Sequence, residues 1–477
     1  MPYPTRRPRR LVAGLLVSAL LALAGCDDGA DGAHASPARS VEGVYRTDGY
    51  GTAVVIRGHR LRTYETTAVS CAPGSLRGEQ HGGTGPGGRR TYAVPDSAPV
   101  TVTPDGAGRA RLRIADDAGS RTLRRTGRLP HRCGRRPARD PRAVFDVFWR
   151  TYAENYPFFE AKGVDWRAVR DRYRPQVTAH TSDAELFAIL RKMIEPLHDA
   201  HTALSAGEHR RYAGMRQDTE PPTKKTLARI EKATAESVGV RQRRWAHGAI
   251  SFAELPGMGK PLGYLRITRF EGYTGRDTYA SDAAELDRAL DAVFTAHRIR
   301  RLGGLVLDLR FNAGGADPLG LRLASRLTGH PYRAYAKRAR NDPAHEGKFT
   351  RPEPIRVAPH HGPAYTGKLA VLTSRYTVSA GETAVQALTG RSPAPVRVGG
   401  NTQGAFSDTL DRTLPNGWQF SLPNEEFRAR GGRTYDGTGI PPQHRTPVYT
   451  DEEFAHHRDS ALAKARALLR GDRHRGH

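Results

Sequence analysis

The chain has 477 residues, of which 38% are hydrophobic, and it carries a formal net charge of +26 at pH 7. At roughly 100–200 residues per domain, this length predicts about three domains, and the hydrophobic fraction is low for a membrane-embedded protein. Arginine is scattered through every region and supplies nearly all of the excess charge, which is typical of a solvated surface; an anionic lipid or wall polymer is the alternative partner, and no pattern for binding nucleic acid accompanies the arginines.

The N-terminus has the pattern of an export signal. A basic stretch, MPYPTRRPRR, precedes the apolar run LVAGLLVSALLALA, which is long enough for a signal-peptide core but short for a bilayer span. The run ends in Leu23-Ala24-Gly25-Cys26, which resembles a lipobox. Residues 1–25 are therefore predicted to be a lipoprotein signal peptide, with Cys26 as the lipidated start of an extracytoplasmic, membrane-anchored protein. An ordinary secretory signal is the alternative, and Arg9-Arg10 leave Sec and twin-arginine export both open.

Residues 26–40, rich in Asp, Gly and Ala, are predicted to form a flexible tether. Residues 41–135 contain short strand-like runs separated by Gly, Pro and Asp-Gly, which predicts a small all-β domain. Disulfides persist outside the cytoplasm, so we predict a bridge between Cys71 and Cys133; two separate buried thiols are the alternative. The runs are GTAVVIRG, RLRTYETTAV, APVTVTP, RARLRIA and RTLRRTGRL.

Residues 138–215 place apolar residues at helical spacing and are predicted to be a helical segment. Asp140-Pro141 and Ser182-Asp183 make good helix starts. Residues 216–258 are polar and irregular, and they are assigned to a linker or insertion.

Between residues 259 and 450, apolar strands alternate with amphipathic helices. The segments GYLRITRF, GGLVLDLR, KLAVLTS and PVRVGG predict strands. Continuous apolar strands between helices indicate a mostly parallel sheet covered on both faces, so the fold class is α/β. Residues 451–477 are expected to form a closing helix and a tail.

The segment RYTVSAGETA, residues 375–384, places Ser379 where a buried strand ends and a helix begins. A serine there can be the helix N-cap, and Glu382 three residues later would complete a capping box. It can also be a nucleophile, because the next amide, that of Ala380, lies at a helix N-terminus and can face developing negative charge. On this segment alone, capping is the simpler interpretation.

Two further segments could complete such a site. The stretch LVLDLRFNAGGADP runs from a buried strand into Gly314-Gly315, where glycines permit a nest of amides at a second helix start. The stretch PLHDAHTALS carries His201 at the end of a helical run. His198 lies three residues earlier, so a metal pair is conceivable, but no third ligand lies nearby in the sequence and no metal is predicted.

Together these segments resemble the tail-specific, C-terminal-processing serine peptidases, and in particular the branch of the tricorn protease core. The resemblance covers roughly residues 140–450 and depends on four motifs in the order of that family. They are D-x-H-T at Asp199-Ala200-His201-Thr202, D-L-R-x-N-x-G-G at Asp308-Leu309-Arg310-Phe311-Asn312-Ala313-Gly314-Gly315, S-A-x-E at Ser379-Ala380-Gly381-Glu382, and Y-[ED]-G-x-G-I at Tyr435-Asp436-Gly437-Thr438-Gly439-Ile440.

This resemblance implies a crotonase-like α/β core that cleaves polypeptides without a cofactor. Ser379 would be the nucleophile and His201 the general base. Asp436 would orient the base directly or through a hydroxyl such as that of Thr202.

The resemblance also implies an oxyanion hole built from the amides of Gly314 or Gly315 and of Ala380. The chain departs from the family pattern at Asp436, where a glutamate is usual, and at Ala200, where the tricorn core has a serine. We find no PDZ-like segment in the sequence.

Three alternatives accompany this interpretation. A lysine base, as in another branch of the family, is disfavoured because residues 401–405, NTQGA, hold no lysine where that motif would fall. A non-catalytic ligand- or peptide-binding module is the alternative function, since the interphotoreceptor retinoid-binding protein repeats share the fold. An acyl-CoA enzyme is the third, and export disfavours it because CoA is cytosolic.

Overall fold

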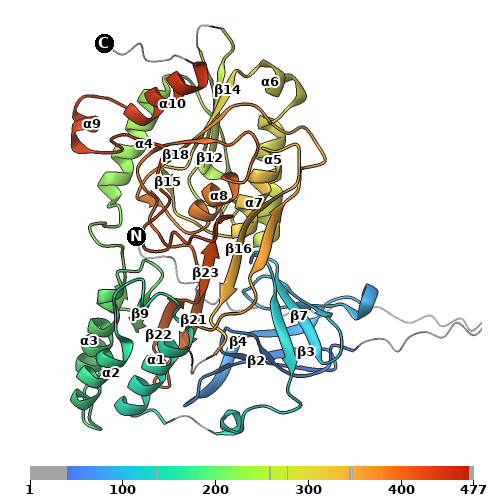
Figure 1. Cartoon of the computed structure of the whole chain (residues 1–477), viewed down its shortest axis with the longest axis vertical. Coiled ribbons are helices and arrows are strands. Elements are labelled where there is room, and N and C mark those ends of the chain that lie inside the picture. Colours follow the sequence, from blue (N-terminus) through green and yellow to red (C-terminus); the bar gives the residue numbers. More distant parts are fainter. Residues whose placement is uncertain are drawn as a thin grey trace, which may run out of the picture.

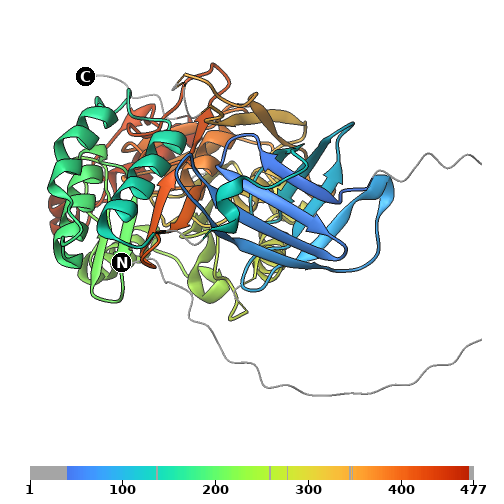
Figure 2. The same cartoon turned by 90° about the horizontal axis from the view of Figure 1, so that it is seen from below.

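The computed structural model describes residues 40–135, 138–256, 259–276, 278–342, 345 and 347–471. The predicted signal peptide, Cys26 and nearly all of the tether lie outside these residues. A β-barrel, a helical part and an α/β core follow one another along the chain and pack side by side (Figures 1 and 2). Within the described residues, no helix combines the length and the apolar character that crossing a membrane requires.

The N-terminal all-β domain is a closed antiparallel barrel of eight strands. Alternating residues point inward: in β7, Ala110 and Leu112 are buried between exposed arginines. The barrel closes where β8 pairs with β1, with Tyr45 opposite Arg125. The strands are β1 (Gly43–Thr47), β2 (Thr52–Arg57), β3 (Arg60–Thr66), β4 (Cys71–Gln80), β5 (Arg90–Ala93), β6 (Val100–Pro104), β7 (Arg109–Ile114) and β8 (Arg121–Arg125).

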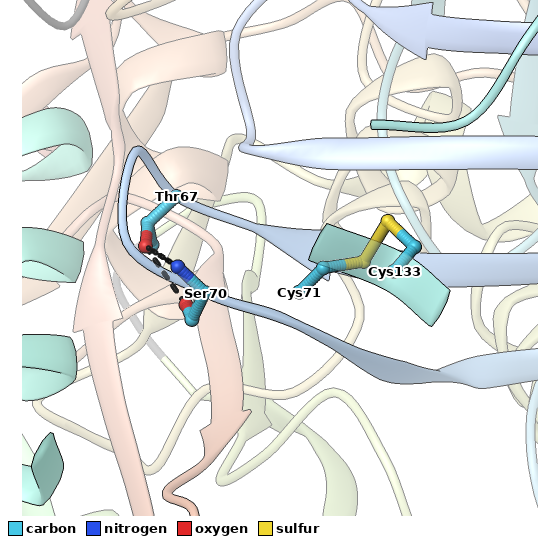
Figure 3. Close-up of a disulfide and its surroundings, with 4 residues drawn as sticks. All are labelled: Thr67, Ser70, Cys71 and Cys133. Carbon is cyan, nitrogen blue, oxygen red and sulfur yellow. Dashed lines mark hydrogen bonds between the residues drawn. A yellow bond between two sulfur atoms is a disulfide. The ribbon is translucent and has the colours of Figure 1, made fainter. Parts of the chain in front are cut away.

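Cys71 and Cys133 form a disulfide, the same pairing that the sequence predicted (Figure 3). Cys71 begins β4, and the turn before it is fixed because the Ser70 N–H donates to the Thr67 hydroxyl at 3.0 Å. Cys133 follows the last barrel strand. The bond therefore holds the segment that leaves the barrel against the barrel wall.

The predicted helical segment contains three helices with an aromatic-rich core. The N-cap Ser182 forms a capping box with Glu185, as its sequence position suggested. Phe148 packs against Phe420 from a distant strand, with ring centroids 5.0 Å apart, so this part does not fold around its own residues alone. The helices are α1 (Pro141–Asn155), α2 (Trp166–Tyr173) and α3 (Asp183–Ile194).

The end of the predicted helical segment is not helical. Residues 203–213 contain β9 (Ala203–Ala206) and β10 (Arg210–Ala213), which join β22 (Gln419–Pro423) and β21 (Thr409–Thr413) in a four-stranded sheet. The sequence pattern missed these strands because the partner of β9 is β22, far along the chain.

The α/β core has a seven-stranded sheet in the order β11-β12-β13-β14-β18-β20-β24. Five strands from β13 to β24 run parallel, as predicted, and β12 and β11 add an antiparallel edge. Helices α5, α7 and α8 cover one face, while α4 and α10 cover the other. The strands are β11 (Arg243–Trp245), β12 (Ile250–Leu255), β13 (Leu262–Ile267), β14 (Gly304–Asp308), β18 (Leu369–Thr373), β20 (Val396–Gly399) and β24 (His444–Arg445).

Helices alternate with these strands as predicted, and α9 and α10 take the place of the one closing helix that was expected. They are α5 (Tyr279–Val293), α6 (Ala296–Arg301), α7 (Asp317–Ser325), α8 (Ala380–Leu388), α9 (Asp451–Ala455) and α10 (Ser460–Arg470). A separate three-stranded sheet extends from the core toward the barrel (Figure 1). Its strands are β16 (Tyr332–Ala339), β17 (Glu353–Val357) and β23 (Glu425–Arg428).

Residues 216–258 are not the irregular linker that their composition suggested. They contain α4 (Lys224–Val238) and the two edge strands β11 and β12. Helix α4 buries Ile230, Thr234 and Val238 on one narrow face of a largely charged helix. With so few apolar residues, the helical period was too weak to detect in the sequence.

A buried ion-pair cluster fastens the C-terminal helix to the centre of the sheet. Arg310 follows β14, and its guanidinium donates to Asp308 and to Asp459, each at 2.6 Å. Asp459 is the N-cap of α10. Tyr264 donates to the same Asp308 carboxylate at 2.6 Å. The D-L-R part of the predicted motif is therefore structural, because Asp308 and Arg310 are each only 1% exposed and pair with each other inside the core.

Candidate active site

Ser379 lies at the turn between the buried strand β18 and helix α8, and its backbone is strained. Its φ is 54°, a region that residues other than glycine rarely adopt and that costs on the order of 1–3 kcal/mol. The N-caps of other helices in this chain, such as Ser182 and Thr223, have φ near −70° instead (−68° and −73°). Ser379 is thus held in a conformation that ordinary capping does not require.

Three hydrogen bonds hold this turn in place. The Ser379 N–H donates to the Ala405 carbonyl at 3.1 Å, and the Val378 N–H donates to the Asn312 carbonyl at 2.9 Å. The Thr377 hydroxyl donates to the Leu309 carbonyl at 2.6 Å. The surrounding backbone therefore fixes the serine from two sides, which is how a strained residue persists.

The predicted glycine turn lies directly against Ser379. A Cβ atom added to Gly314 would stand 2.7 Å from the Ser379 Cβ, so only glycine permits this approach. The Gly314 N–H donates to the Asn312 side chain at 3.0 Å and is therefore already used. Among the described residues, no hydrogen bond occupies the N–H of Gly315 or of Ala380, which leaves these two as the available donors beside the serine.

A buried loop of residues 404–408, GAFSD, connects the predicted site residues. Its Ala405 carbonyl accepts from Ser379, and its Phe406 N–H donates to the Asp436 carboxylate at 3.3 Å. The Ser407 backbone lies beside the His201 ring and favours its protonated form. Three consecutive loop residues therefore contact the three residues that the sequence nominated for catalysis. This 404–408 loop was not among the predicted site residues, since nothing in its sequence indicates catalysis.

Glu382 fixes the loop to the serine turn. Its carboxylate accepts hydrogen bonds from the amides of Gly404 at 2.7 Å, Ala405 at 2.8 Å and Ser379 at 3.2 Å. Burial raises the pKa of Glu382 to about 7, and these hydrogen bonds, with one from Thr402, oppose the rise. The predicted capping glutamate thus also holds a second segment of chain.

Glu382→Gln is expected to loosen this arrangement while keeping the side-chain shape. The amide NH2 cannot accept, so at least one backbone N–H of the loop or turn loses its partner, at about 1–3 kcal/mol. Thermal unfolding should show that loss as a lowered free energy of unfolding. A control at Glu185, whose carboxylate caps an exposed helix start, should lose less when changed to Gln. Equal losses of unfolding free energy at both positions would contradict the role of Glu382 in holding the loop to the serine turn.

His201 is half-buried near the loop. Its backbone N–H donates to the Asp199 carboxylate at 2.9 Å, and its ring Nδ1 is buried with no partner among the described residues. Burial lowers the pKa of His201, opposed by the nearby charges of Asp199 and Asp411. No hydrogen bond between the His201 ring and Ser379 is formed within the described part of the chain.

Asp436 contacts the loop through Phe406 and is half-buried. Besides Phe406, its carboxylate accepts from the Thr434 hydroxyl at 2.6 Å. Burial raises the pKa of Asp436 well above its usual value, and the charges of Asp199 and Glu382 raise it further. No hydrogen bond from Asp436 to His201 is found in the residues that the structure describes.

Thr202 does not bridge these two residues. Its hydroxyl donates to the Asp199 carbonyl at 2.8 Å, so it stabilises the turn that carries His201. The carboxylate beside His201 along the chain is Asp199, which accepts from Tyr156 Oη at 2.9 Å. Asp199 was visible in the D-x-H-T motif, whereas Tyr156, at the end of α1, had no signal in the sequence.

Lys162 is a second residue that the sequence did not indicate. Its ammonium donates to the His198 carbonyl at 3.2 Å and would lie 2.9 Å from a Cβ added to Gly437, next to Asp436. It therefore links the histidine turn to the aspartate turn. Within the described residues, no three His, Cys, Asp or Glu side chains are placed to hold a metal ion together.

Two protein-family models match this chain, one over the α/β core and one over the helical part. Residues 261–446 match the model of peptidase family S41, and residues 137–195 match the Tricorn protease C1 domain. A candidate peptidase from Parabacteroides merdae is 25% identical with a TM-score of 0.57, over 70% of this chain and 97% of that one. Mature CPAF shares the fold at 12% identity and a TM-score of 0.50, over 70% of this chain and 98% of that one.

No curated protein sequence matches the chain. The S41 match spans β13 to β24, and so includes the serine turn, the glycine turn, the 404–408 loop and Asp436. The Tricorn C1 match covers the helices that lead to His201. Residues 261–446 therefore form a domain of peptidase family S41, a family of serine peptidases, and a Tricorn C1 domain precedes this peptidase core.

Proposed function

We propose that this protein hydrolyses peptide bonds of polypeptides with Ser379 as the nucleophile and His201 as the general base. The observation that carries this proposal is the strained Ser379 backbone, held against the glycine turn and the 404–408 loop. Strain of this kind persists where the surrounding structure maintains it, and it gathers at catalytic positions.

In the proposed reaction, Ser379 Oγ attacks the carbonyl carbon of the scissile bond while its proton passes to a ring nitrogen of His201. The negative charge that develops on the carbonyl oxygen is stabilised by the N–H groups of Gly315 and Ala380. His201 then gives the proton to the leaving amine, and water releases the acyl group from Ser379 by the same steps in reverse.

The base must approach the serine for this reaction, since their hydrogen bond is not formed in this structure. Catalytic hydrogen bonds are often long without substrate and tighten when it binds. The loop that contacts both residues is the element whose movement would bring them together. Asp199 would stabilise the imidazolium, because its charge raises the pKa of His201.

A fluorophosphonate probe tests the proposal most directly, because it forms a covalent bond only with an activated serine. We expect one adduct, located by peptide mass spectrometry at Ser379, and its loss after heat denaturation. The non-catalytic binding module, our second candidate, is favoured by the missing Ser379–His201 hydrogen bond and predicts no adduct. An adduct at another serine would contradict the nucleophile assignment.

Export and lipid anchoring at Cys26 form a further part of this proposal, supported by the lipobox pattern Leu23-Ala24-Gly25-Cys26. Cys26→Ser is expected to move the protein from the membrane fraction to the soluble extracytoplasmic fraction, because a serine cannot take the thioether-linked lipid. Intact mass measurement should show the lipid on wild type only. A wild-type N-terminus without lipid would contradict the anchor, while leaving the peptidase proposal untouched.

A further inference from the structure

A buried group of charges lies where the barrel meets the core. Its centre is Lys337 in β16, whose side chain is only 3% exposed. The ammonium lies 2.6 Å from Asp117 Oδ1, 2.8 Å from Asp408 Oδ2 and 3.3 Å from Glu425 Oε2. The ammonium donates hydrogen bonds to Asp117 and Asp408, and its contact with Glu425 is an ion pair.

The three carboxylates come from three different parts of the molecule. Asp117 belongs to the barrel turn between β7 and β8, Glu425 begins β23, and Asp408 ends the 404–408 loop. Lys337 therefore joins the barrel to the loop that contacts Ser379, Asp436 and His201. No motif of the peptidase resemblance includes Asp117 or Lys337.

The barrel adds two more side chains to this group. Arg121 lies over the Tyr50 ring, 4.4 Å from its centroid, and its guanidinium is 3.5 Å from Asp117. Tyr50 donates to the second carboxylate oxygen of Glu425. Burial and the charge of Asp408 raise the pKa of Asp117 to about 6, while Lys337 and Arg121 oppose the rise, so Asp117 is ionised at neutral pH.

The Ser407–Asp408 end of the loop is held by hydrogen bonds in this region. The Ser407 hydroxyl accepts from the amides of Asn424 and Glu425, each at 3.0 Å, and donates to the Asp408 carbonyl at 2.6 Å. Glu382 holds the other end of the loop, where its carboxylate accepts from the amides of Gly404 and Ala405. The loop is thus held at one end by Glu382 of α8 and at the other end by the charged residues around Lys337, which include Asp117 of the barrel.

We propose that Asp117 is a positioning residue of the active site: through Lys337 and Asp408, the barrel holds the 404–408 loop beneath Ser379. The barrel is then an integral part of the active site. The catalytic consequence depends on the proposed peptidase function, whereas the holding of the loop does not.

The physical basis is charge balance around a buried ammonium, since the Lys337 side chain is almost fully buried while Asp408 is partly exposed. Removing one carboxylate from a buried ion group leaves a charge uncompensated, and such groups relax by moving or admitting water. When Asp117 becomes neutral, Lys337 is drawn toward its two remaining partners, and Asp408 is one of them. The loop shifts with Asp408, and a displacement near 1 Å at a catalytic centre can lower a rate by roughly 100-fold.

Asp117→Asn tests this proposal in the full chain, because it keeps the side-chain shape and removes only the charge. The matched control is Glu353→Gln. Glu353 also joins the barrel to the core, accepting from the Ser120 N–H and hydroxyl at 2.9 Å each. Within the described residues it forms no hydrogen bond or ion pair with the 404–408 loop. Hydrogen exchange, read by mass spectrometry on peptides spanning 400–410, reports the loop directly.

We expect Asp117→Asn to speed exchange of the Gly404, Ala405 and Phe406 amides by about tenfold or more, and Glu353→Gln to change it by less than about twofold. Unchanged exchange in Asp117→Asn would overturn the proposal. Equal acceleration in both variants would overturn it too, because that result means general loosening of the barrel.

Kinetics give the second measurement. Asp117→Asn is expected to lower kcat by about tenfold with KM within about twofold of wild type, as a displaced catalytic group requires. If wild type hydrolyses nothing, the peptidase function fails and the exchange result still decides whether the barrel holds the loop.

If Asp117→Asn does not fold, Asp408→Asn replaces it, since Lys337 keeps two of its partners in that variant. The same acceleration of amide exchange in the loop is expected. Normal exchange in that variant would overturn the proposal.

Discussion

Ser379→Ala is expected to lower kcat/KM for an unfolded polypeptide by about 10³-fold or more, the scale seen when a serine nucleophile is removed. The hydroxyl is lost without a change in backbone strain, because alanine is no easier to hold at φ 54° than serine. Substrate binding should persist, so KM or a measured Kd should change little. Residual activity within tenfold of wild type would remove Ser379 from the nucleophile's role.

Ser379→Gly supplies the matched control for strain. Glycine adopts positive φ without a steric penalty, so this variant should be equally inactive but more stable than Ser379→Ala by about 1 kcal/mol. Chemical denaturation of the two variants measures the difference. A glycine variant less stable than the alanine variant would show that the turn is not strained in solution, which would remove the main observation behind the proposed function.

His201→Ala is the second large effect that we expect, again on the order of 10³-fold in kcat/KM. Because base and nucleophile act as one unit, the double variant His201→Ala/Ser379→Ala should be no slower than either single variant. His198→Asn is the control, since His198 is exposed and has φ 45°, which asparagine tolerates. If the decreases in kcat/KM of the two single variants multiply in the double variant, His201 and Ser379 do not act in the same catalytic step.

The pH dependence follows from the same residue. His201 accepts a proton only when neutral, and burial lowers the pKa of His201 below its usual 6.5. Activity should therefore rise with pH, with the midpoint of the rise below 6.5. A midpoint near 7 would indicate instead a transition of Glu382, whose pKa burial raises to about 7, and Glu382→Gln would then abolish it.

The parallel core could be predicted well from the sequence, because its strands are continuous apolar runs and its turns carry glycine or serine. Gly314 and Ser379 lie side by side, as a joint site requires, because both follow neighbouring parallel strands and such strand ends meet at one edge. Strand β9 and helix α4 could not be predicted. The strand forms only when β22 pairs with it, and the helix buries just one narrow apolar face.

Only part of the candidate site could be predicted from the sequence, because the rest depends on contacts between distant segments. Ser379 and His201 belong to recognisable motifs, whereas the 404–408 loop has no periodic pattern and no titratable residue except Asp408. Its importance depends on where its backbone hydrogen bonds go, to Glu382 and Asp436, and these partners come from distant segments. The link to Asp117 could not be inferred either, because nothing in a sequence places a barrel turn next to a core lysine.

The attachment of α10 affects the order in which the chain can become active. Arg310 is paired with Asp459, and α10 covers the face of the sheet formed by Val306, Ala370 and Leu372. Until these last residues have been synthesised, the central strands keep an apolar face open to water and a guanidinium without its second carboxylate. The chain thus cannot complete its peptidase core until α10 has docked on the sheet, and cleavage should begin only after that step.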